Sequence, residues 1–530
     1  MYPRYISGSI WASTPKTDVI YQTIDQVREN LENAQELWAA SDIVILIAGM
    51  IVPGKYLGGT PISVREAKQF FSDSRLDEIP KLLVGPWARF GCGLEGGQLA
   101  LSSDVLSPPI TDIVTGDAEV VIGELVKNNW ELSSVDLNAT RQSAQEIEEY
   151  VIRGTSLVTQ FPGFSKGYII CEIETYRGCP RFFTGGCSFC TEPLYGMPQV
   201  RNPKEIIKEI ESLYAYGVRA FRIGRQADLF TYGSKEIGDE EFPTPNPSAL
   251  EELFSGIRNV APQLRVLHID NVNPGTIAHH PKESCEIAKI IMKYHTPGDV
   301  AAFGVESLDP EVRKRNNLKV SEDEAYTAVR ILNEVGAIRP KWGLPHLLPG
   351  INLLYGLDGE RKQTLNYNME FLQRLVDDGL MIRRINVRQV IGFPNTTLDK
   401  KKPKKLKRNL FFRHKEAIRE RIDRVMIERV APSGTIIESL FVEQDRGKSV
   451  LLRPLGTYPL QCQMPVPDGQ IDGTLDVVVT QHGPRSLTVL PYPLMVNKMS
   501  LAQWRAIPGL GVKLAARIKI SRKGFYIVRF

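Results

Sequence analysis

Cysteine and histidine are both scarce, with seven of each in 530 residues. Four of the cysteines stand alone in the sequence, which excludes a disulfide-rich secreted fold and favours a cytoplasmic location. No apolar run is long enough to cross a bilayer, so no membrane partner is expected. No G-x-G-x-x-G motif follows the first predicted strand, so the sequence does not support a dinucleotide site.

Acidic residues are rare in two C-terminal segments. Residues 400–424 hold twelve Lys or Arg against three acids, and residues 500–530 hold seven Lys or Arg and no acid. The net charge is only +4, so the rest of the chain is mildly acidic. This distribution predicts a polyanionic partner at the C-terminal end, most often nucleic acid. A solvated surface or linker is the alternative interpretation.

The N-terminal part alternates between predicted strands and helices. Strands are expected at 42–48, 81–85 and 110–115, with helical patterns at 20–39 and 63–76. This alternation predicts an α/β fold with a doubly wound parallel sheet over residues 1–140. Ligands of such sheets bind at the carboxyl ends of the strands.

The central part, residues 160–398, alternates more regularly. Asn202 and Pro203 start one helix, and Ser321 with Glu324 forms a capping-box pattern at another. Six β/α units in series predict a partial (β/α)6 barrel, whose functional face is the carboxyl end of its strands. The six strands are expected at 167–174, 218–224, 265–270, 300–306, 351–356 and 384–391.

Three further segments follow the predicted barrel. Residues 399–427 read as a basic helical linker. Residues 428–490 contain short strands separated by Gly and Pro, which predict a small β-barrel. Residues 491–530 contain two short helical patterns around a glycine turn.

Three cysteines, Cys179, Cys187 and Cys190, follow the first strand of the predicted barrel, so their loop opens on its functional face. A structural zinc site has four protein ligands, and no histidine lies nearby. Four cysteines hold an ordinary iron–sulfur cluster, whereas three leave one iron open to a small molecule. The trio therefore predicts a metal centre with an open position, with structural zinc and a chance grouping as alternatives.

The stretch "YRGC…GCSFC" resembles the radical S-adenosylmethionine superfamily, over about residues 165–395. The first cysteine gap is seven residues instead of the family's three, and the final C-x-aromatic-C is kept. The resemblance implies that the three cysteines hold a 4Fe–4S cluster whose open iron binds S-adenosylmethionine. It also implies an electron donor such as ferredoxin or flavodoxin, and a 5′-deoxyadenosyl radical that abstracts hydrogen from the substrate.

The same resemblance assigns roles to residues at later strand ends. Gly224-Arg225-Gln226 stands where the family often has G-G-E, and resembles the glycine–glutamine stretch of methylthiotransferases. Arg388, on the last strand, is expected in the barrel mouth as a catalytic residue. An ordinary barrel ion pair is the alternative for Glu306 and Arg388. The expected cofactor-binding residues are Phe189, Gly224, Arg225, Gln226, Asp228, Glu306, Gly356 and Gly359.

The flanking segments carry weaker resemblances. The N-terminal domain resembles the cobalamin-binding-like domain that precedes many radical barrels, but no histidine occurs before His268, so cobalamin is not expected. Residues 428–490 resemble the small RNA-binding β-barrel of methylthiotransferases. "IPGLG" at 507–511 resembles a helix–hairpin–helix element, in which backbone N–H groups approach a phosphate. Its expected nucleic-acid contacts are Gly509, Gly511, Lys513 and Arg517.

This order of domains resembles a group of archaeal radical enzymes. The sequence therefore predicts a radical enzyme that modifies a nucleic acid base in tRNA or rRNA, by methylthiolation or methylation. One alternative is a radical enzyme that acts on a small molecule or peptide. The other is a non-enzymatic, zinc-containing nucleic-acid-binding protein.

Overall fold

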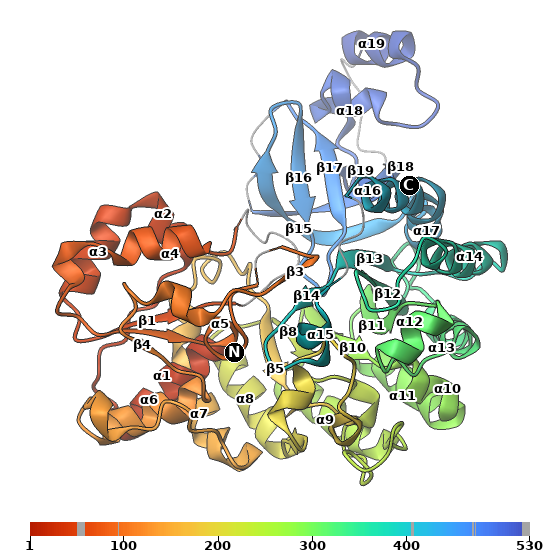
Figure 1. The fold of residues 1–530 in the computed structure, drawn as a ribbon. Coiled ribbons are helices and arrows are strands. Elements are labelled where there is room, and N and C mark those ends of the chain that lie inside the picture. The colour runs from red at the N-terminus through yellow and green to blue at the C-terminus, as the bar shows by residue number, and fades with distance from the viewer. Residues whose placement is uncertain (50–58, 94, 404–407, 469–470, 472, 522–530) are drawn as a thin grey trace.

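Figure 1 shows the arrangement of the chain, with the N-terminal domain in red and orange beside a strand-and-helix barrel in yellow to teal. A small β-barrel in blue lies above the larger one, and the last two helices extend beyond it. The computed structural model describes residues 1–49, 59–93, 95–403, 408–468, 471 and 473–521. No helix among these residues is long and apolar enough to cross a membrane.

A parallel sheet in the order β1-β2-β4 forms the centre of the N-terminal domain, and its strands lie within the predicted ranges. These strands are β1 (Val44–Ile47), β2 (Lys81–Val84) and β4 (Asp112–Ile113). Leu82 and Val84 pack against helices on one face, and Leu83 packs with Phe71 and Trp87 on the other. The helices are α1 (Tyr2–Ser13), α2 (Ile24–Glu29), α3 (Leu31–Ala39), α4 (Val64–Phe71), α5 (Pro86–Phe90), α6 (Ala118–Lys127) and α7 (Glu148–Arg153).

The larger barrel is built from two parallel sheets, in the orders β5-β8-β9 and β10-β11-β12-β13. Asp270 joins them, because its carbonyl accepts a hydrogen bond of 2.9 Å from the Ala302 N–H. β13 and β5 are edge strands of the two sheets, so the barrel is open between them. The strands are β5 (Cys171–Glu174), β8 (Ala220–Gly224), β9 (Val266–Ile269), β10 (Asn271–Val272), β11 (Asp299–Glu306), β12 (Leu347–Tyr355) and β13 (Arg384–Gln389).

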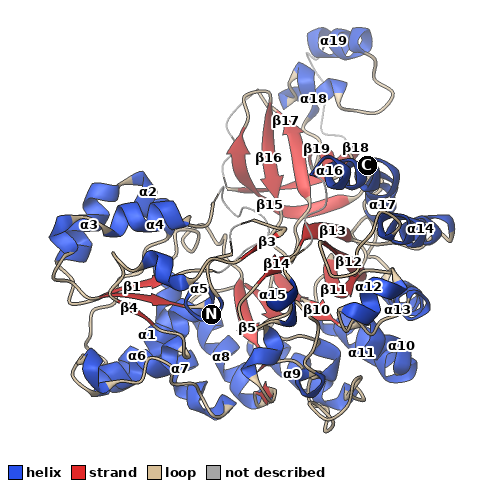
Figure 2. Cartoon of the chain, viewed as in Figure 1, coloured by secondary structure: helices blue, strands red, loops and turns tan. Residues whose placement is uncertain are grey.

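Helices cover the outside of these strands (Figure 2). In α8, Asn202 caps the first turn as expected, and Ile206, Ile210 and Leu213 are buried against the sheet. The predicted capping box of Ser321 and Glu324 is present at the start of α13. The helices are α8 (Pro203–Ala215), α9 (Pro247–Val260), α10 (Pro274–His279), α11 (Pro281–Tyr294), α12 (Pro310–Arg315), α13 (Glu322–Gly336) and α14 (Thr364–Asp377).

The segment expected to be a basic linker is a helical part of the barrel. Phe411, Ile418, Ile422 and Met426 are buried in the same core as the barrel strands. One face is therefore apolar despite the many cations, which a charge count does not show. Its elements are α15 (Thr397–Lys401), α16 (Arg408–Ile418), a π-helical turn (Arg419–Asp423) and α17 (Arg424–Val430).

The C-terminal strands form a closed five-stranded barrel in the order β15-β16-β17-β19-β18, as the short strands predicted. Its strands are β15 (Ile436–Asp445), β16 (Ser449–Arg453), β17 (Gln461–Pro465), β18 (Thr474–His482) and β19 (Ser486–Pro491). Two helices follow, α18 (Leu501–Arg505) and α19 (Val512–Ser521), and they pack together through Trp504 and Ala515.

The N-terminal domain is joined to the larger barrel in two places. Arg4 on α1 pairs with Glu209 on α8 at 2.6 Å, and both side chains are buried. In addition, β3 (Gln98–Leu99) pairs in parallel with β14 (Ile391–Gly392), which follows the last barrel strand. The two domains therefore share both an ion pair and a strand pairing.

Candidate functional site

The cysteine loop leaves the barrel at the carboxyl end of β5, between β6 (Tyr176–Arg177) and β7 (Gln199–Val200). Cys190 N–H donates to the Cys187 carbonyl at 3.0 Å, which brings two of the three cysteines into one turn. Gly186 has a φ of 61°, and a Cβ there would lie 2.3 Å from Pro193. Only glycine fits this close, left-handed turn.

Two neighbouring segments hold the loop by its backbone. The Ser188 N–H donates to the Asn316 carbonyl at 3.0 Å, and the Leu398 N–H donates to the Ser188 carbonyl at 2.8 Å. The Asn317 side-chain amide donates to the Gly186 carbonyl at 2.7 Å. The ends of α12 and the start of α15 therefore fix the loop above the strand ends.

The three thiols are half-buried in the loop. Burial raises the pKa of Cys179 to about 12, and it raises the pKa values of Cys187 and Cys190 as well. The Arg181 guanidinium donates to the Cys187 sulfur at 3.3 Å. Such thiols deprotonate when a metal replaces their protons, because the bound cation offsets the cost of a buried thiolate.

The donor set of the loop is three cysteine thiols. Within the described ranges, no three His, Cys, Asp or Glu side chains are arranged to share one metal ion. An iron–sulfur cluster is held by thiolates that bind different irons. Three thiols in one loop are compatible in their chemistry with a three-cysteine 4Fe–4S cluster, and this assignment stays a prediction.

Apolar side chains pack beside the loop. Phe189 and Cys187 contact a small core that includes Leu357 and Leu398. Gly356 and Gly359 belong to the turn after β12, with φ values of 91° and 82°, and the Gly356 N–H donates to the Glu360 carboxylate. Phe189 and the glycine turn therefore border the same side of the cysteine loop.

The predicted cofactor-binding residues at the end of β8 and just after it point in different directions. Gly224 faces the barrel interior, where a Cβ would lie 2.7 Å from the Glu172 carboxylate. Arg225 points toward the cysteine loop and pairs with Glu192 at 2.5 Å. The Gln226 amide is buried, accepting from Thr175 at 3.2 Å. Asp228 accepts from the Thr276 hydroxyl at 2.7 Å, and burial raises its pKa to about 6. Gln226 and Asp228 therefore already have protein partners, and their cofactor roles stay predictions.

Glu306 and Arg388 lie at the carboxyl ends of β11 and β13, on either side of β12. Glu306 sits at a bulge of β11 with a φ of 64°, and burial raises its pKa to about 8, although the charge of Arg388 opposes this shift. Arg388 donates to the Asn386 side chain at 3.1 Å. Glu306 therefore holds its proton at neutral pH, which is not the behaviour of an ordinary barrel ion pair.

The inner face of the barrel carries polar residues that the sequence analysis did not select. Arg222 bridges Glu172 at 2.9 Å and Asp270 at 2.7 Å. Their alternation with buried apolar neighbours in "CEIE", "FRIG" and "LHID" was the available signal. Tyr458 arrives from the small barrel and donates to Asp270 at 2.6 Å, and no local pattern predicts that contact.

The N-terminal domain contacts the turn after the cysteine loop, where Arg89 packs against the ring of Tyr195. Three guanidinium groups surround its ring, with Arg89, Arg177 and Arg225 at 4.3, 4.9 and 5.1 Å from the centroid. Cys92, in contrast, has an exposed fraction of 0% within the apolar core of that domain. This cysteine is not placed to join the cysteine loop.

The predicted nucleic-acid residues surround the turn between α18 and α19. Gly509 has a φ of 82°, and no atom lies within 4 Å of a Cβ built on Gly509 or Gly511. Lys513 and Arg517 are exposed on α19. The four residues lie together on an open surface at the end of the molecule, and their contact with nucleic acid stays a prediction.

The larger barrel is similar to known proteins. Residues 173–355 match the family model of the radical SAM superfamily. An uncharacterized protein of Methanocaldococcus jannaschii is 45% identical over 499 residues, covering 92% of this chain and 88% of the relative. A tRNA-2-methylthio-N(6)-dimethylallyladenosine synthase of Lachnoclostridium phytofermentans is 23% identical over 292 residues, covering 54% and 57%.

Solved structures show more distant similarity. A radical S-adenosylmethionine methyltransferase, TsrM from Kitasatospora setae, has a TM-score of 0.47 and 14% identity, covering 75% of this chain and 72% of its own. The cobalamin-dependent radical enzyme OxsB has a TM-score of 0.45 and 14% identity, covering 73% and 51%. Nothing in these comparisons supports the expectation that the N-terminal domain lacks cobalamin, which stays a prediction.

Proposed function

Because this chain is an enzyme of the radical S-adenosylmethionine superfamily, we propose that Cys179, Cys187 and Cys190 hold its 4Fe–4S cluster and that it modifies an RNA base. It belongs to the same family as the Methanocaldococcus jannaschii relative. The observation that carries the proposal is the loop of three half-buried thiols fixed above the carboxyl ends of the barrel strands. When bound, the reduced cluster supplies the electron that cleaves S-adenosylmethionine and yields a 5′-deoxyadenosyl radical.

The residues around the loop would bind and orient the reactants. Phe189 and the turn at Gly356 offer an apolar wall to the adenine. Arg181 donates to the Cys187 sulfur at 3.3 Å, and its positive charge favours the thiolate form. Burial raises the pKa of Glu306 to about 8, so its protonated carboxyl group can donate a hydrogen bond to a bound molecule. A buried, pre-arranged set of this kind favours one orientation of the bound molecule.

Three observations support RNA as the substrate. The small barrel is closed and is followed by the exposed cations Lys513 and Arg517 on α19. One distant relative is, by its name, a synthase that acts on tRNA. The chain also carries its cationic segments at the C-terminal end, where electrostatic capture would bring a strand to the barrel.

Methylation is the reaction that the cysteines favour. A methylthiotransferase of the resembled class needs a second cluster held by N-terminal cysteines, and Cys92 is the one cysteine before the larger barrel. Its thiol is enclosed by apolar side chains, and burial raises its pKa to about 11. A single cysteine enclosed in an apolar core does not supply the three thiolates that such a second cluster needs.

The first test is anaerobic purification with iron and sulfide analysis, followed by incubation with S-adenosylmethionine and dithionite. About four irons per chain and 5′-deoxyadenosine should appear in the wild type and be lost in Cys187→Ala. Cys285→Ala is the matched control, because Cys285 is a half-buried cysteine on α11, away from the loop. Zinc in place of iron, or an intact cluster without cleavage, would contradict the radical mechanism.

The second test incubates the active enzyme with methyl-labelled S-adenosylmethionine and archaeal tRNA. Label in a tRNA nucleoside supports base methylation. Release of label only into small molecules or peptides from a cell extract would instead favour the small-molecule or peptide alternative.

A further inference from the structure

Two arginines on the inner face of β13 stand without a carboxylate partner. Arg384 and Arg388 are both half-buried, while Ile385 and Val387 between them face the helical core. No ion pair joins either guanidinium to a carboxylate of the described residues. Burial lowers the pKa values of both arginines. An uncompensated buried cation is costly, so its retention favours an anionic ligand.

The nearby carboxyl groups do not neutralise this region. Asp423 pairs with Arg485 at 3.4 Å, and burial raises the pKa of Asp423 to about 7. Glu306 is the carboxyl group whose charge acts on Arg388. Burial raises the pKa of Glu306 to about 8, which favours its protonated form at neutral pH. Burial, together with the charges of Arg419, Arg485 and Arg388, lowers the pKa of Lys415. Asp270, whose charge acts on Arg384, is already paired with Arg222 at 2.7 Å and accepts from the Tyr458 hydroxyl. The cations of this region therefore outnumber its unpaired carboxylates.

A loop of the small barrel fixes the position of Arg384. The Arg384 guanidinium lies 3.6 Å from the centroid of the Tyr458 ring, and the Tyr458 hydroxyl donates to Asp270 at 2.6 Å. The Thr457 N–H donates to His268 Nδ1 at 3.0 Å, and Arg383 donates to the Tyr458 carbonyl at 3.0 Å.

Tyr458 adopts a backbone conformation that a bulky residue rarely adopts. Its φ is 55°, in the left-handed region. Strain of this kind persists where the surrounding contacts over-determine it, often at a ligand site. The strained backbone at Tyr458 therefore places an aromatic ring against the Arg384 guanidinium.

We propose that Arg384 and Arg388, with Lys415 and Arg485 beside them, bind a phosphate of the RNA substrate at the open edge of the barrel, and that Tyr458 positions Arg384 for this contact. The inference rests on the proposed RNA substrate. Guanidinium groups suit this ligand because their N–H donors match two oxygens of one phosphate. The site includes residues from both barrels, so it is complete only when the small barrel is docked.

The test measures binding of a short single-stranded RNA by the full-length protein across a range of salt concentrations. Arg384→Gln and Arg388→Gln should each weaken binding about 10-fold and lower the salt slope by about 1. A methylphosphonate oligomer with the same bases, which lacks backbone charge, should bind wild type and variants alike. Arg384→Lys should recover part of the affinity, and Tyr458→Leu should resemble Arg384→Gln, whereas Tyr458→Phe keeps the ring.

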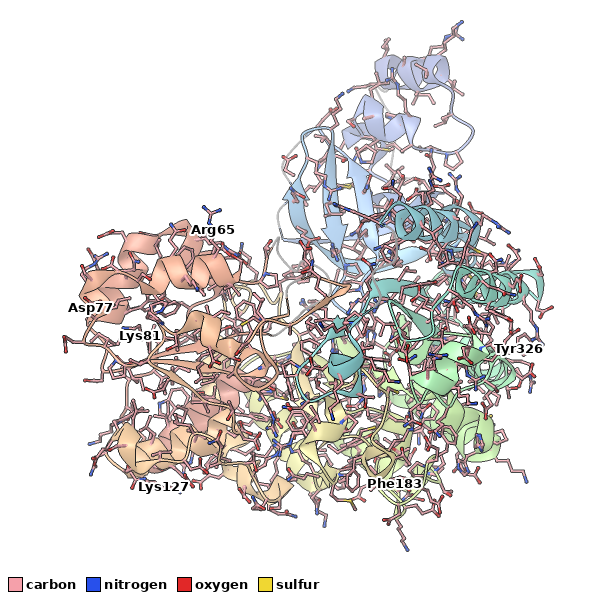
Figure 3. The ribbon with its side chains drawn as sticks, viewed as in Figure 1. Arg65, Asp77, Lys81, Lys127, Phe183 and Tyr326 are labelled. Atoms are coloured by element: carbon pink, nitrogen blue, oxygen red, sulfur yellow. The ribbon has the colours of Figure 1, made fainter. Side chains whose placement is uncertain are left out.

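Arg65→Gln and Lys127→Gln are controls, because both side chains are exposed on the N-terminal domain, away from the small barrel (Figure 3). Unchanged affinity and salt slope in both arginine variants would overturn the proposal. So would a selective loss of S-adenosylmethionine binding, since the oxyanion would then be its carboxylate. If the wild type with dithionite formed no 5′-deoxyadenosine, the radical mechanism would be contradicted instead. Failure of the phosphate-site proposal can therefore be told apart from failure of the radical mechanism.

Discussion

A buried ion network holds the strand from which the cysteine loop departs, and removing its one shared carboxylate should loosen that strand. Glu209 pairs with Arg4 at 2.6 Å and with Arg201 at 2.7 Å, and all three side chains are almost fully buried. Both arginines also donate to backbone carbonyls of β5, at Glu172 and Glu174. Burial alone would raise the pKa of Glu209, but the charges of Arg201 and Arg4 hold it below its ordinary value.

The perturbation is Glu209→Gln, which keeps the shape of the side chain and removes its charge. Removing one member of a buried ion pair costs about 3–5 kcal/mol, because the remaining charge is left uncompensated. A loss of about 3 kcal/mol corresponds to hydrogen exchange that is about 100-fold faster at the β5 amides, if those amides exchange through local opening. The measurement is native-state exchange of residues 171–174, alongside the iron content.

Glu205→Gln provides the control on the same helix. Its partner Lys208 is exposed, so water screens this surface pair and the β5 amides should not change. The double variant Arg4→Met/Glu209→Gln should be less destabilised than the sum of its single variants, because one uncompensated charge is gone. Exchange within about 10-fold of wild type in Glu209→Gln, with unchanged iron, would refute the argument that the network holds β5.

Three further predictions concern other parts of the chain. Burial lowers the pKa of His414 to about 4, below its unfolded value, so its contribution to stability falls as pH drops below about 6.5. Equilibrium unfolding should show about 2 kcal/mol lost between pH 6.5 and 5, and His414→Gln should remove that share. Gly154→Ala places a Cβ 1.8 Å from the Arg4 carbonyl, so it should displace α1, cost about 1–3 kcal/mol and speed exchange of β5 amides. Combining Lys513→Gln with Arg517→Gln should lower the salt slope of RNA binding by about 2, whereas unchanged binding would remove α19 from the RNA surface.

The elements that were predicted correctly from the sequence are those with a clear local pattern of apolar and capping residues. β8 and α8 matched because alternating or helical apolar positions coincide with a capping residue such as Asn202. The small closed barrel was predicted from short strands bounded by Gly and Pro. The three cysteines could be selected because their spacing and their place after a strand both restrict the chemistry.

Contacts between distant segments could not be predicted in this way. The Tyr458 ring beneath Arg384 depends on how two domains dock, and neither local sequence reports it. Residues 399–427 were predicted to be a basic helical linker because their cations outnumber the apolar residues that face the core. The proton held by Glu306 likewise follows from burial, which a family motif does not reveal.

The pairing of β3 with β14 has a consequence for the order in which the chain folds. During synthesis, β3 cannot pair until Ile391 and Gly392 of β14 have been made. Likewise, Arg4 cannot form its ion pair until Glu209 has been made. The first domain to emerge is thus among the last to be completed, the reverse of ordinary domain-by-domain folding. Such distant pairings slow folding and leave a strand edge open meanwhile. A chain truncated before residue 391 would keep that edge exposed beside Leu99 and Leu101, which are already partly exposed in the complete fold.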